Sequence, residues 1–210
     1  MMKDNIEDYY SDVILIGTGI MSATLGTFLK KLEPDWTMRI FERMDRVAME
    51  SSEAWNNAGT GHSAFCELNY TPETSDGGIN INKAVKIAES FEISKEFWAT
   101  LVTQGIIENP EDIIRQIPHI SFVWGKENTD FLLKRYATMR LNALFSDMQY
   151  STDPSVLNEW MPLVMDGRDN SEPVAGTRMD LGTDVNFGTL SHTLLQYLDR
   201  KSTRLNSSHQ

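Results

Sequence analysis

The N-terminal region carries apolar patterns that predict a strand, a helix and a second strand. Residues 13–16 are all apolar and end at Gly17, which is typical of a parallel strand that is buried on both faces. Apolar residues recur at helical spacing over residues 21–32, and residues 37–41 form a second extended run that ends at Glu42. A unit of this length fits a right-handed parallel crossover.

The rest of the chain mixes helical and extended patterns. Apolar positions at helical spacing predict three further helices, over residues 83–104, 132–143 and 190–198. Residues 120–124 read as a strand, and Asp153 before Pro154 has the N-cap pairing of a short helix. Residues 51–64 and 166–186 show neither period. We expect an extended functional loop in the first of these segments and a series of turns in the second.

The composition is that of a folded, acidic protein. Of 210 residues, 40% are hydrophobic and 23% are charged, which is too apolar for a disordered chain. The net charge of −11 argues against nucleic acid as a partner, because neutralising phosphates requires a basic face. A single cysteine, Cys66, excludes an intramolecular disulfide and a multi-cysteine metal site. With no apolar run of membrane-spanning length and no signal-peptide pattern, we expect a cytoplasmic location.

The last residues, 199–210, do not continue the helical pattern that precedes them. They are basic and rich in serine, and a permitted reverse translation of residues 199–209 resembles a widely used sequencing adapter. We therefore expect a non-native tail that interrupts a helix at about Leu198, the alternative being a natural flexible tail.

A glycine motif follows the first predicted strand. It reads Gly17-x-Gly19-x-x-Ser22. The first glycine permits a tight turn, and the second lets backbone N–H groups approach a pyrophosphate at the helix N-terminus. The third position needs only a small residue for close packing, and Ser22 meets that need. Glu42 lies 25 residues after Gly17, where a carboxylate accepts hydrogen bonds from ribose hydroxyls and repels the extra phosphate of NADP. The alternative is a plain glycine turn with a solvated glutamate.

The loop over residues 51–64 is the most distinctive segment of the chain. Its glycines, asparagines and hydroxyls offer donors and a close backbone approach, which suits an isoalloxazine ring and its ribityl chain better than a nicotinamide. The residues expected to contact this cofactor are Ser51, Ser52, Asn56, Asn57, Gly59, Thr60 and Gly61.

Here the sequence resembles a known family. Residues 51–64 read Ser-Ser-x-x-Trp-Asn-Asn-Ala-Gly-Thr-Gly-His-Ser-Ala, residues 16–26 read Ile-Gly-x-Gly-Ile-Met-Ser-Ala-Thr-Leu-Gly, and residues 118–125 read Pro-His-x-Ser-Phe-Val-Trp-Gly. These runs are similar to those of the FAD-dependent malate:quinone oxidoreductases. The resemblance extends from about residue 12 to residue 198 and covers more than the dinucleotide motif that many flavoproteins share.

The resemblance implies a fold and a domain order. It implies an α/β fold, with a Rossmann-like FAD-binding domain and a mixed α+β substrate domain, incomplete at the C-terminus because family members are more than twice this length. The first part of the FAD domain would occupy residues 1–104 and the start of the substrate domain residues 105–183. Residues 184–198 would form a helix that returns to the FAD domain.

The resemblance also implies an activity. Family members are peripheral membrane flavoenzymes of the tricarboxylic acid cycle that oxidise L-malate to oxaloacetate and pass the electrons to quinone. The reaction needs a hydride acceptor, which is flavin N5, a base for the hydroxyl proton, and cations for two carboxylates. The membrane and quinone contacts would lie mainly in the part that is absent here.

Histidines are the candidates for the base, and arginines for binding malate. His62 lies within the flavin loop and His119 precedes a strand, whereas His192, among leucines, is a poor candidate. Arg178 and Arg115 could each clamp a carboxylate. The alternatives are that both histidines are structural and both arginines are surface residues.

Two other functions stay open. A related FAD-dependent oxidase of 2-hydroxy acids would use oxygen as acceptor. The chain as given could also be a catalytically inactive fragment that binds nucleotide. An NAD-linked dehydrogenase fits less well, because the loop of residues 51–64 has no role there.

Overall fold

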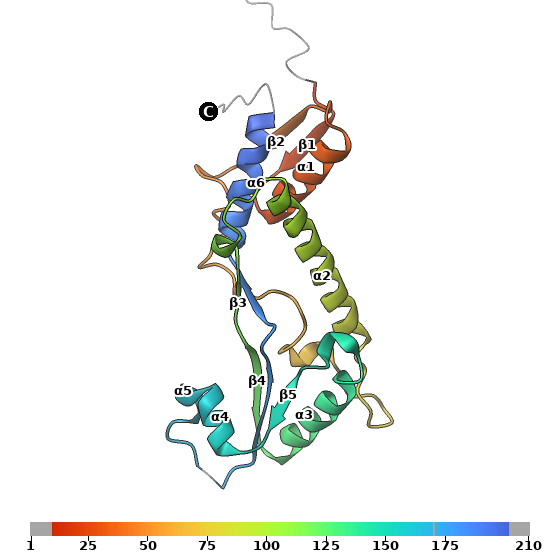
Figure 1. The fold of residues 1–210 in the computed structure, drawn as a ribbon, viewed down its shortest axis with the longest axis vertical. Helices are drawn as coiled ribbons and strands as arrows, with labels where there is room; N and C mark the ends of the chain where they lie inside the picture. Colours follow the sequence, from red (N-terminus) through yellow and green to blue (C-terminus); the bar gives the residue numbers. More distant parts are fainter. Residues whose placement is uncertain (1–9, 170, 202–210) are drawn as a thin grey trace, which may run out of the picture. The chain divides into compact units, whose positions relative to one another are not determined.

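The computed structural model describes residues 10–169 and 171–201 (Figure 1). The chain forms two compact units. Unit 1 contains the described residues up to 59, residues 100–114 and the residues from 185 onward, and unit 2 contains residues 60–99 and 115–184. Within the described residues, no helix is long and apolar enough to cross a membrane.

Unit 1 begins with the strand, helix and strand that the sequence predicted. Strand β1 (Val13–Ile16), helix α1 (Ile20–Leu32) and strand β2 (Met38–Phe41) follow one another. The two strands pair in parallel, with Val13 opposite Met38 and Ile16 opposite Phe41. The predicted parallel crossover is therefore confirmed.

Helix α6 (Phe187–Lys201) packs along α1 in the same unit (Figure 1). The close contact lies at Gly26, where an added Cβ would stand 2.8 Å from Leu198 Cδ1 and 3.1 Å from Leu15 Cδ1. A residue without a side chain is therefore required at this crossing. The glycine motif predicts close packing at Ser22, which is only partly buried, while Gly26 is the residue at which the elements meet.

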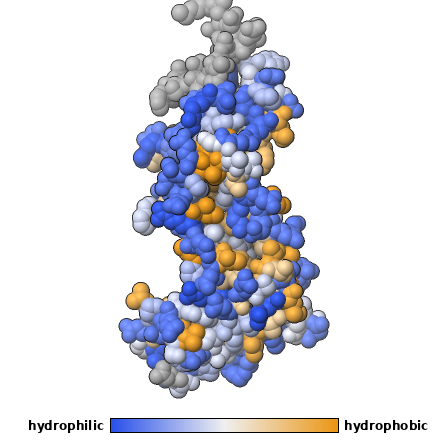
Figure 2. Space-filling view, in the orientation of Figure 1, coloured by the Kyte–Doolittle hydropathy of each residue, from blue (hydrophilic) through white to orange (hydrophobic). Residues whose placement is uncertain are grey.

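The apolar stripe of α1 does not face the core of unit 1. Its large side chains are exposed by 40–81%: Met21, Leu25, Phe28 and Leu32. In β1, Leu15 is buried, whereas Ile14 and Ile16 are 60% and 85% exposed. The predicted burial of this strand on both faces is wrong, because β1 belongs to a two-stranded sheet and, among the described residues, only the Leu15 face is covered. Apolar residues also reach the surface elsewhere (Figure 2).

Unit 2 is built on a three-stranded antiparallel sheet. Its strands are β4 (His119–Trp124), β6 (Val174–Met179) and β5 (Gln149–Ser151), with β6 in the centre. His119 lies opposite Met179 in the register. Helix α3 (Lys126–Met139) packs on β4 and β6, and its Leu132 is fully buried beside Val123 and Ala175.

The remaining elements are shorter, apart from helix α2. They are α2 (Asn82–Thr103), β3 (Ile114–Gln116), β7 (Thr183–Val185), α4 (Pro154–Trp160), α5 (Pro162–Met165) and short 3₁₀ helices at Leu68–Tyr70, Pro110–Asp112 and Ala143–Phe145. β3 pairs with β7. The predicted helix over residues 83–104, the strand over residues 120–124 and the last helix are confirmed by α2, β4 and α6. So is the Asp153 cap, which accepts a hydrogen bond from Ser155 N at 2.8 Å.

One prediction of secondary structure is confirmed in part and one is wrong. The helix predicted over residues 132–143 is confirmed as α3 up to Met139, where it ends. The Asn142 side chain then accepts a hydrogen bond from Leu144 N at 3.0 Å and starts a 3₁₀ turn. The segment 166–186, predicted as turns, contains β6 and β7. Strand β6 is buried at almost every position, so its sequence shows no alternation of apolar and polar residues.

The helices and strands decide neither whether residues 199–210 are a non-native tail nor where the predicted domains end. Helix α6 continues to Lys201, within the segment 199–210, and residues 202–210 lie outside the described part of the chain. The units are defined by contacts, whereas the predicted domains 1–104, 105–183 and 184–198 are defined by function. Those domain assignments stay predictions.

Candidate functional site

The glycine turn of unit 1 has the geometry that the motif predicts. Gly17 has φ +86°, and an added Cβ would meet no atom within 4 Å, while its N–H donates to Phe41 O at 2.7 Å. The conformation therefore requires glycine, while the space beside it is open. Gly19 is the N-cap of α1, with no side-chain cap. The N–H groups of a helix start of this kind attract an anion.

Ser52 reaches this helix start from the distinctive loop. Its hydroxyl is buried and accepts a hydrogen bond from Ile20 N at 2.9 Å, and it would lie 3.1 Å from a Cβ at position 19. Three residues predicted to contact the cofactor, Gly17, Gly19 and Ser52, therefore lie together, whereas Ser51 is exposed. Because the Ser52 hydroxyl carries no charge, it does not neutralise the partial positive charge at the N-terminus of α1.

Glu42 is engaged by its own chain at the end of β2. One carboxylate oxygen accepts from Thr18 N (2.8 Å) and from the Thr18 hydroxyl. The other accepts from Arg43 N (2.7 Å) and Met44 N (2.9 Å). These bonds, that of the Thr18 hydroxyl first, lower the pKa of Glu42. A ribose would have to share or displace some of these donors. Glu42 organises the turn in this structure, and its contact with a ribose stays a prediction.

The two asparagines of the loop bind their own backbone. Asn56 Nδ2 donates to Glu50 O at 3.0 Å, and Asn57 Nδ2 donates to Ser51 O at 2.9 Å. Asn57 Oδ1 accepts from Gly59 N at 2.8 Å, next to the left-handed conformation of Gly59 (φ +63°). Both amides thus shape the loop, and their contact with a cofactor stays a prediction.

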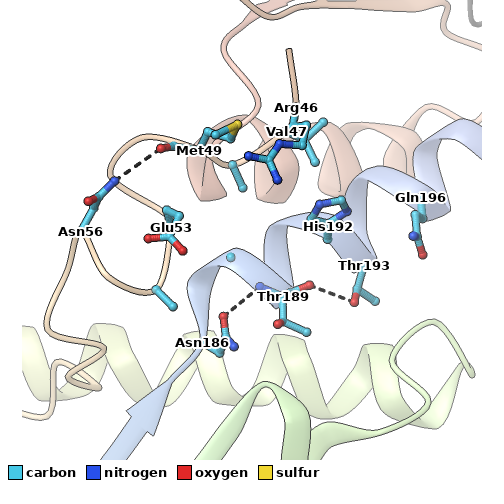
Figure 3. A pocket seen from close by; sticks show the side chains of 13 residues that line it. Arg46, Val47, Met49, Glu53, Asn56, Asn186, Thr189, His192, Thr193 and Gln196 are labelled. Atoms are coloured by element: carbon cyan, nitrogen blue, oxygen red, sulfur yellow. Dashed lines mark hydrogen bonds between the residues drawn. The ribbon is translucent and has the colours of Figure 1, made fainter. Parts of the chain in front are cut away.

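A cavity of about 830 Å³ lies in unit 1 between this loop and α6 (Figure 3). One wall consists of residues 46–49, which precede the loop, and of residues 53, 54 and 56 within it. The other wall consists of Asn186, directly before α6, and of Gly188, Thr189, His192, Thr193 and Gln196 in α6. Of the predicted cofactor residues, Asn56 alone lines it within the described part of the chain. His192, set aside in the sequence analysis, is one of its polar wall residues. The cavity is therefore formed by residues other than those of the glycine turn.

In unit 2, Gly61 and His62 differ sharply in burial. His62 is exposed and Gly61 is buried. Gly61 N donates to Thr183 O at 2.9 Å, and an added Cβ would stand 1.9 Å from Thr183 Oγ1 and 2.6 Å from Phe91 Cζ. Thr60 forms an antiparallel bridge with Asp184. The backbone before His62 is therefore fixed against β7, and its side chain is left accessible to a substrate.

His119, the other predicted base, is buried. It is 6% exposed, and its Nε2 lies 3.0 Å from Thr183 O. A carbonyl oxygen only accepts, so this nitrogen carries the proton in the bond. The other ring nitrogen, Nδ1, is buried with no hydrogen-bond partner among the described residues. Neither nitrogen is placed to reach a substrate in this structure.

The two candidate arginines lie on different sheets of unit 2. Arg178, on β6, donates to Asp180 Oδ1 at 2.6 Å and lies over the Trp160 ring, with its guanidinium 6.0 Å from the ring centre. Binding a carboxylate would require it to leave or share that aspartate. Arg115 is exposed on β3, which pairs with β7 and not with the sheet that carries Arg178. Their joint action on one substrate stays a prediction.

Arg135 is a residue that the sequence analysis did not single out. It is fully buried in α3 and donates to Thr71 Oγ1 (2.9 Å), Phe65 O (3.1 Å) and Ala64 O (3.3 Å). Burial lowers the pKa of Arg135 to about 10. It holds the loop just after His62, where Ala64 has φ +58°. A basic residue within the apolar stripe of residues 132–139 was the signal for this role.

The thiol of Cys66 is not activated as a nucleophile in this structure. Burial raises the pKa of Cys66 to about 11, so the thiolate is scarce at neutral pH. Among the described residues, no group of three His, Cys, Asp or Glu side chains could hold a metal ion.

Known proteins are similar to this chain over most of its length. Residues 9–210 match the family described as Malate:quinone oxidoreductase (Mqo). A probable malate:quinone oxidoreductase of Flavobacterium johnsoniae is 56% identical over 199 residues, which cover 95% of this chain and 40% of that relative. The chain thus spans about 40% of the length of this curated relative.

Solved structures show the same fold. Glycine oxidase from Geobacillus kaustophilus has a TM-score of 0.63 and 18% identity, covering 93% of this chain and 46% of that chain. L-α-Glycerophosphate oxidase from Mycoplasma pneumoniae, solved with FAD bound, has a TM-score of 0.56 and 14% identity, covering 91% of this chain and 43% of that chain. The predicted α/β fold class is confirmed.

Proposed function

Since the chain belongs to the malate:quinone oxidoreductase family, we propose that it supplies part of an FAD-dependent enzyme that oxidises L-malate to oxaloacetate and passes the electrons to a quinone. The observation that carries this proposal is the 56% identity to the Flavobacterium johnsoniae relative over 95% of the chain. Identity at this level extends through both units and beyond the glycine motif that unrelated nucleotide-binding proteins share.

Unit 1 supplies the residues that would hold FAD. The open glycine turn at Gly17 and the start of α1, where Gly19 has no capping side chain of its own, fit a pyrophosphate. Ser52 would add its hydroxyl there, and Glu42 would bind the ribose. When bound, FAD supplies the hydride acceptor. The expected contacts of Ser22, Ser51, Asn56, Asn57 and Gly59 complete the part of this assignment that lies in unit 1. Thr60 and Gly61, also expected to contact FAD, belong to unit 2.

Unit 2 supplies the proton acceptor. We assign that role to His62, because its side chain is exposed while the backbone before it is fixed by the Gly61–Thr183 hydrogen bond. A neutral imidazole there accepts the proton of the malate hydroxyl as the hydride leaves C2. Arg178 and Arg115 would bind the malate carboxylates, which are held by charge-assisted hydrogen bonds.

The electron acceptor determines where in the cell the enzyme would act. A quinone is dissolved in the membrane, so the enzyme would contact the cytoplasmic face of the membrane as a peripheral protein. The contact surface would belong to the part of the relatives that this chain does not cover.

The test uses a full-length hybrid, in which this chain replaces the segment that it matches in the Flavobacterium johnsoniae relative. The purified hybrid is mixed anaerobically with L-malate, and flavin absorbance is followed. We expect bleaching, and rapid reoxidation by a soluble quinone but slow reoxidation by oxygen. Failure of malate to bleach a flavin-loaded hybrid would refute the malate assignment, and fast reoxidation by oxygen alone would favour the oxidase.

The role of His62 is tested in the same hybrid. His62→Gln keeps polarity and approximate size but removes the base, and base loss typically lowers a rate by about 10²–10⁴-fold. We therefore expect flavin reduction to slow by this factor while the FAD content stays at one per chain. If His62 only holds the loop, the same variant will instead lose FAD and keep the reduction rate of the bound fraction.

A further inference from the structure

One backbone carbonyl in unit 2 receives two hydrogen bonds from different parts of the chain. Thr183 O lies 2.9 Å from Gly61 N and 3.0 Å from His119 Nε2. The first donor belongs to the loop that carries His62, and the second is the first residue of β4. A carbonyl has two lone pairs, so both donors are accommodated at once.

The histidine ring is held in this position by its packing. At Gly182 an added Cβ would stand 2.4 Å from His119 Cδ2, so only glycine leaves room for the ring. The Phe65 ring meets it edge to face, with 6.0 Å between ring centres. The ring is thus clamped between Gly182 and Phe65, and its Nε2–H is directed at the Thr183 carbonyl.

The neighbouring loop depends on the same carbonyl. Gly61 is buried against Thr183 and Phe91, and His62 follows it directly. On the other side of His62, Arg135 holds the carbonyls of Ala64 and Phe65. The segment that carries His62 is therefore fixed at both ends, once through β7 and once through α3.

We propose that His119 is a positioning residue and not the base: it holds the Thr183 carbonyl at which Gly61 docks, and thereby places His62. The catalytic part of this proposal rests on the proposed function. The positioning part rests on the shared carbonyl alone. The two histidines then have different chemistry, because His119 donates a hydrogen bond permanently and His62 exchanges a proton with the substrate.

A matched pair of variants separates the two roles in the full-length hybrid. The amide nitrogen of His119→Gln reaches the position of Nε2 and can donate to Thr183 O, whereas the shorter amide of His119→Asn reaches only the position of Nδ1. Neither variant can act as a base near neutral pH. We measure the rate of flavin reduction at saturating malate between pH 5 and 8, where histidine ordinarily titrates.

A histidine base cannot accept a proton once it is protonated, so the parent hybrid should reduce its flavin more slowly at low pH, which gives the profile an acidic limb. We expect His119→Gln to keep the rate within about 3-fold of the parent hybrid and to keep this acidic limb. His119→Asn should lower the rate about 2- to 10-fold, the equivalent of one hydrogen bond, with the same pH dependence. Losses of about 100-fold or more in both variants, with the acidic limb abolished, would identify His119 as the base. An unchanged rate in His119→Asn would also overturn the proposal.

A second measurement does not depend on malate. Amide hydrogen exchange over residues 59–63 should become faster in His119→Asn and stay at the parent rate in His119→Gln, because only the former releases the Thr183 carbonyl. Equal exchange in all three proteins would reject positioning even if malate proved not to be the substrate. If His119→Asn does not fold, the rate and pH profile of His119→Gln still decide between the two roles.

Discussion

The glycine turn of unit 1 and the core of unit 2 differ in how the apolar side chains around them are used. Beside the turn, Ile16, Met21 and Leu32 are exposed by 85%, 81% and 72%, whereas Leu132 and Phe145 in the core of unit 2 are completely buried. The glycine turn is nevertheless well formed, because its hydrogen bonds join one strand–helix–strand unit and the loop that follows it. Its geometry does not require these large side chains to be buried.

The polar groups of unit 2 depend on the core around them. His119 and Thr183 lie 64 positions apart, as do Arg135 and Thr71, whereas Thr18 and Glu42 in unit 1 are separated by 24. A bond between distant residues holds only while the packing that brings them together is intact. The comparison shows that the glycine turn is held within one continuous stretch of the chain, residues 17–52, whereas the position of His62 depends on packing between more distant segments.

The largest expected difference concerns one leucine in each unit. Leu132→Ala should destabilise the chain by about 2–5 kcal/mol, because it leaves a cavity in a close-packed core. Leu25→Ala, at a position 49% exposed in α1, should change the free energy of unfolding by less than about 1 kcal/mol. Urea unfolding of the two variants measures both values.

Equal losses of unfolding free energy in the two variants would contradict this difference, since they would mean that the exposed face of α1 is covered when the chain is alone in solution. The same pair of variants can be compared in the full-length hybrid. If Leu25→Ala becomes costly only there, the remaining part of the relative's chain covers this face.

The next largest expected effect is a loss of stability when Gly61 or Gly17 is replaced. Gly61→Ala forces a methyl group into Thr183 and Phe91, and overpacking of this kind costs about 1–3 kcal/mol. Gly17→Ala meets no atom but is strained at φ +86°, which costs about 1–2 kcal/mol. Gly17→Asn should recover part of that loss, because asparagine tolerates this conformation, whereas Gly61→Asn should be worse than Gly61→Ala. Thermal unfolding of the four variants checks this reversal, and the same ranking at both positions would contradict it.

The smallest effect tests the local bonds of unit 1 through pH. Because the pKa of Glu42 is lowered in the folded chain, its carboxylate stabilises the fold above the ordinary glutamate pKa of about 4.3, and this contribution disappears as the pH falls through the lowered value. Glu42→Gln should therefore cost about 1 kcal/mol at pH 7 and much less at pH 3. The exposed Glu33→Gln serves as control, with a change below about 0.5 kcal/mol at either pH. A pH-independent cost of Glu42→Gln would show that the charge has no part in the turn.

Local elements and the family can be read from the sequence. The glycine turn, the parallel strand–helix–strand unit, the Asp153 cap and the irregular loop over residues 51–64 each lie within one continuous stretch of the chain, and the structure agrees with each prediction. The long motifs were sufficient to identify the malate:quinone oxidoreductases. Patterns of this kind are readable because each is contained in one short segment of the sequence.

Which faces are buried follows from the tertiary packing. Met21 and Leu25 recur at helical spacing in α1, yet Ala23 and Gly26 face the packed side, because a close crossing with α6 selects small residues over large ones. Periodicity likewise missed β6, which has no solvent-facing side. The different surroundings of His62, which is exposed, and His119, which is buried, were open in the sequence for the same reason. An imidazole's function depends on its exposure and on the partner it meets, and His119 meets a carbonyl 64 positions away.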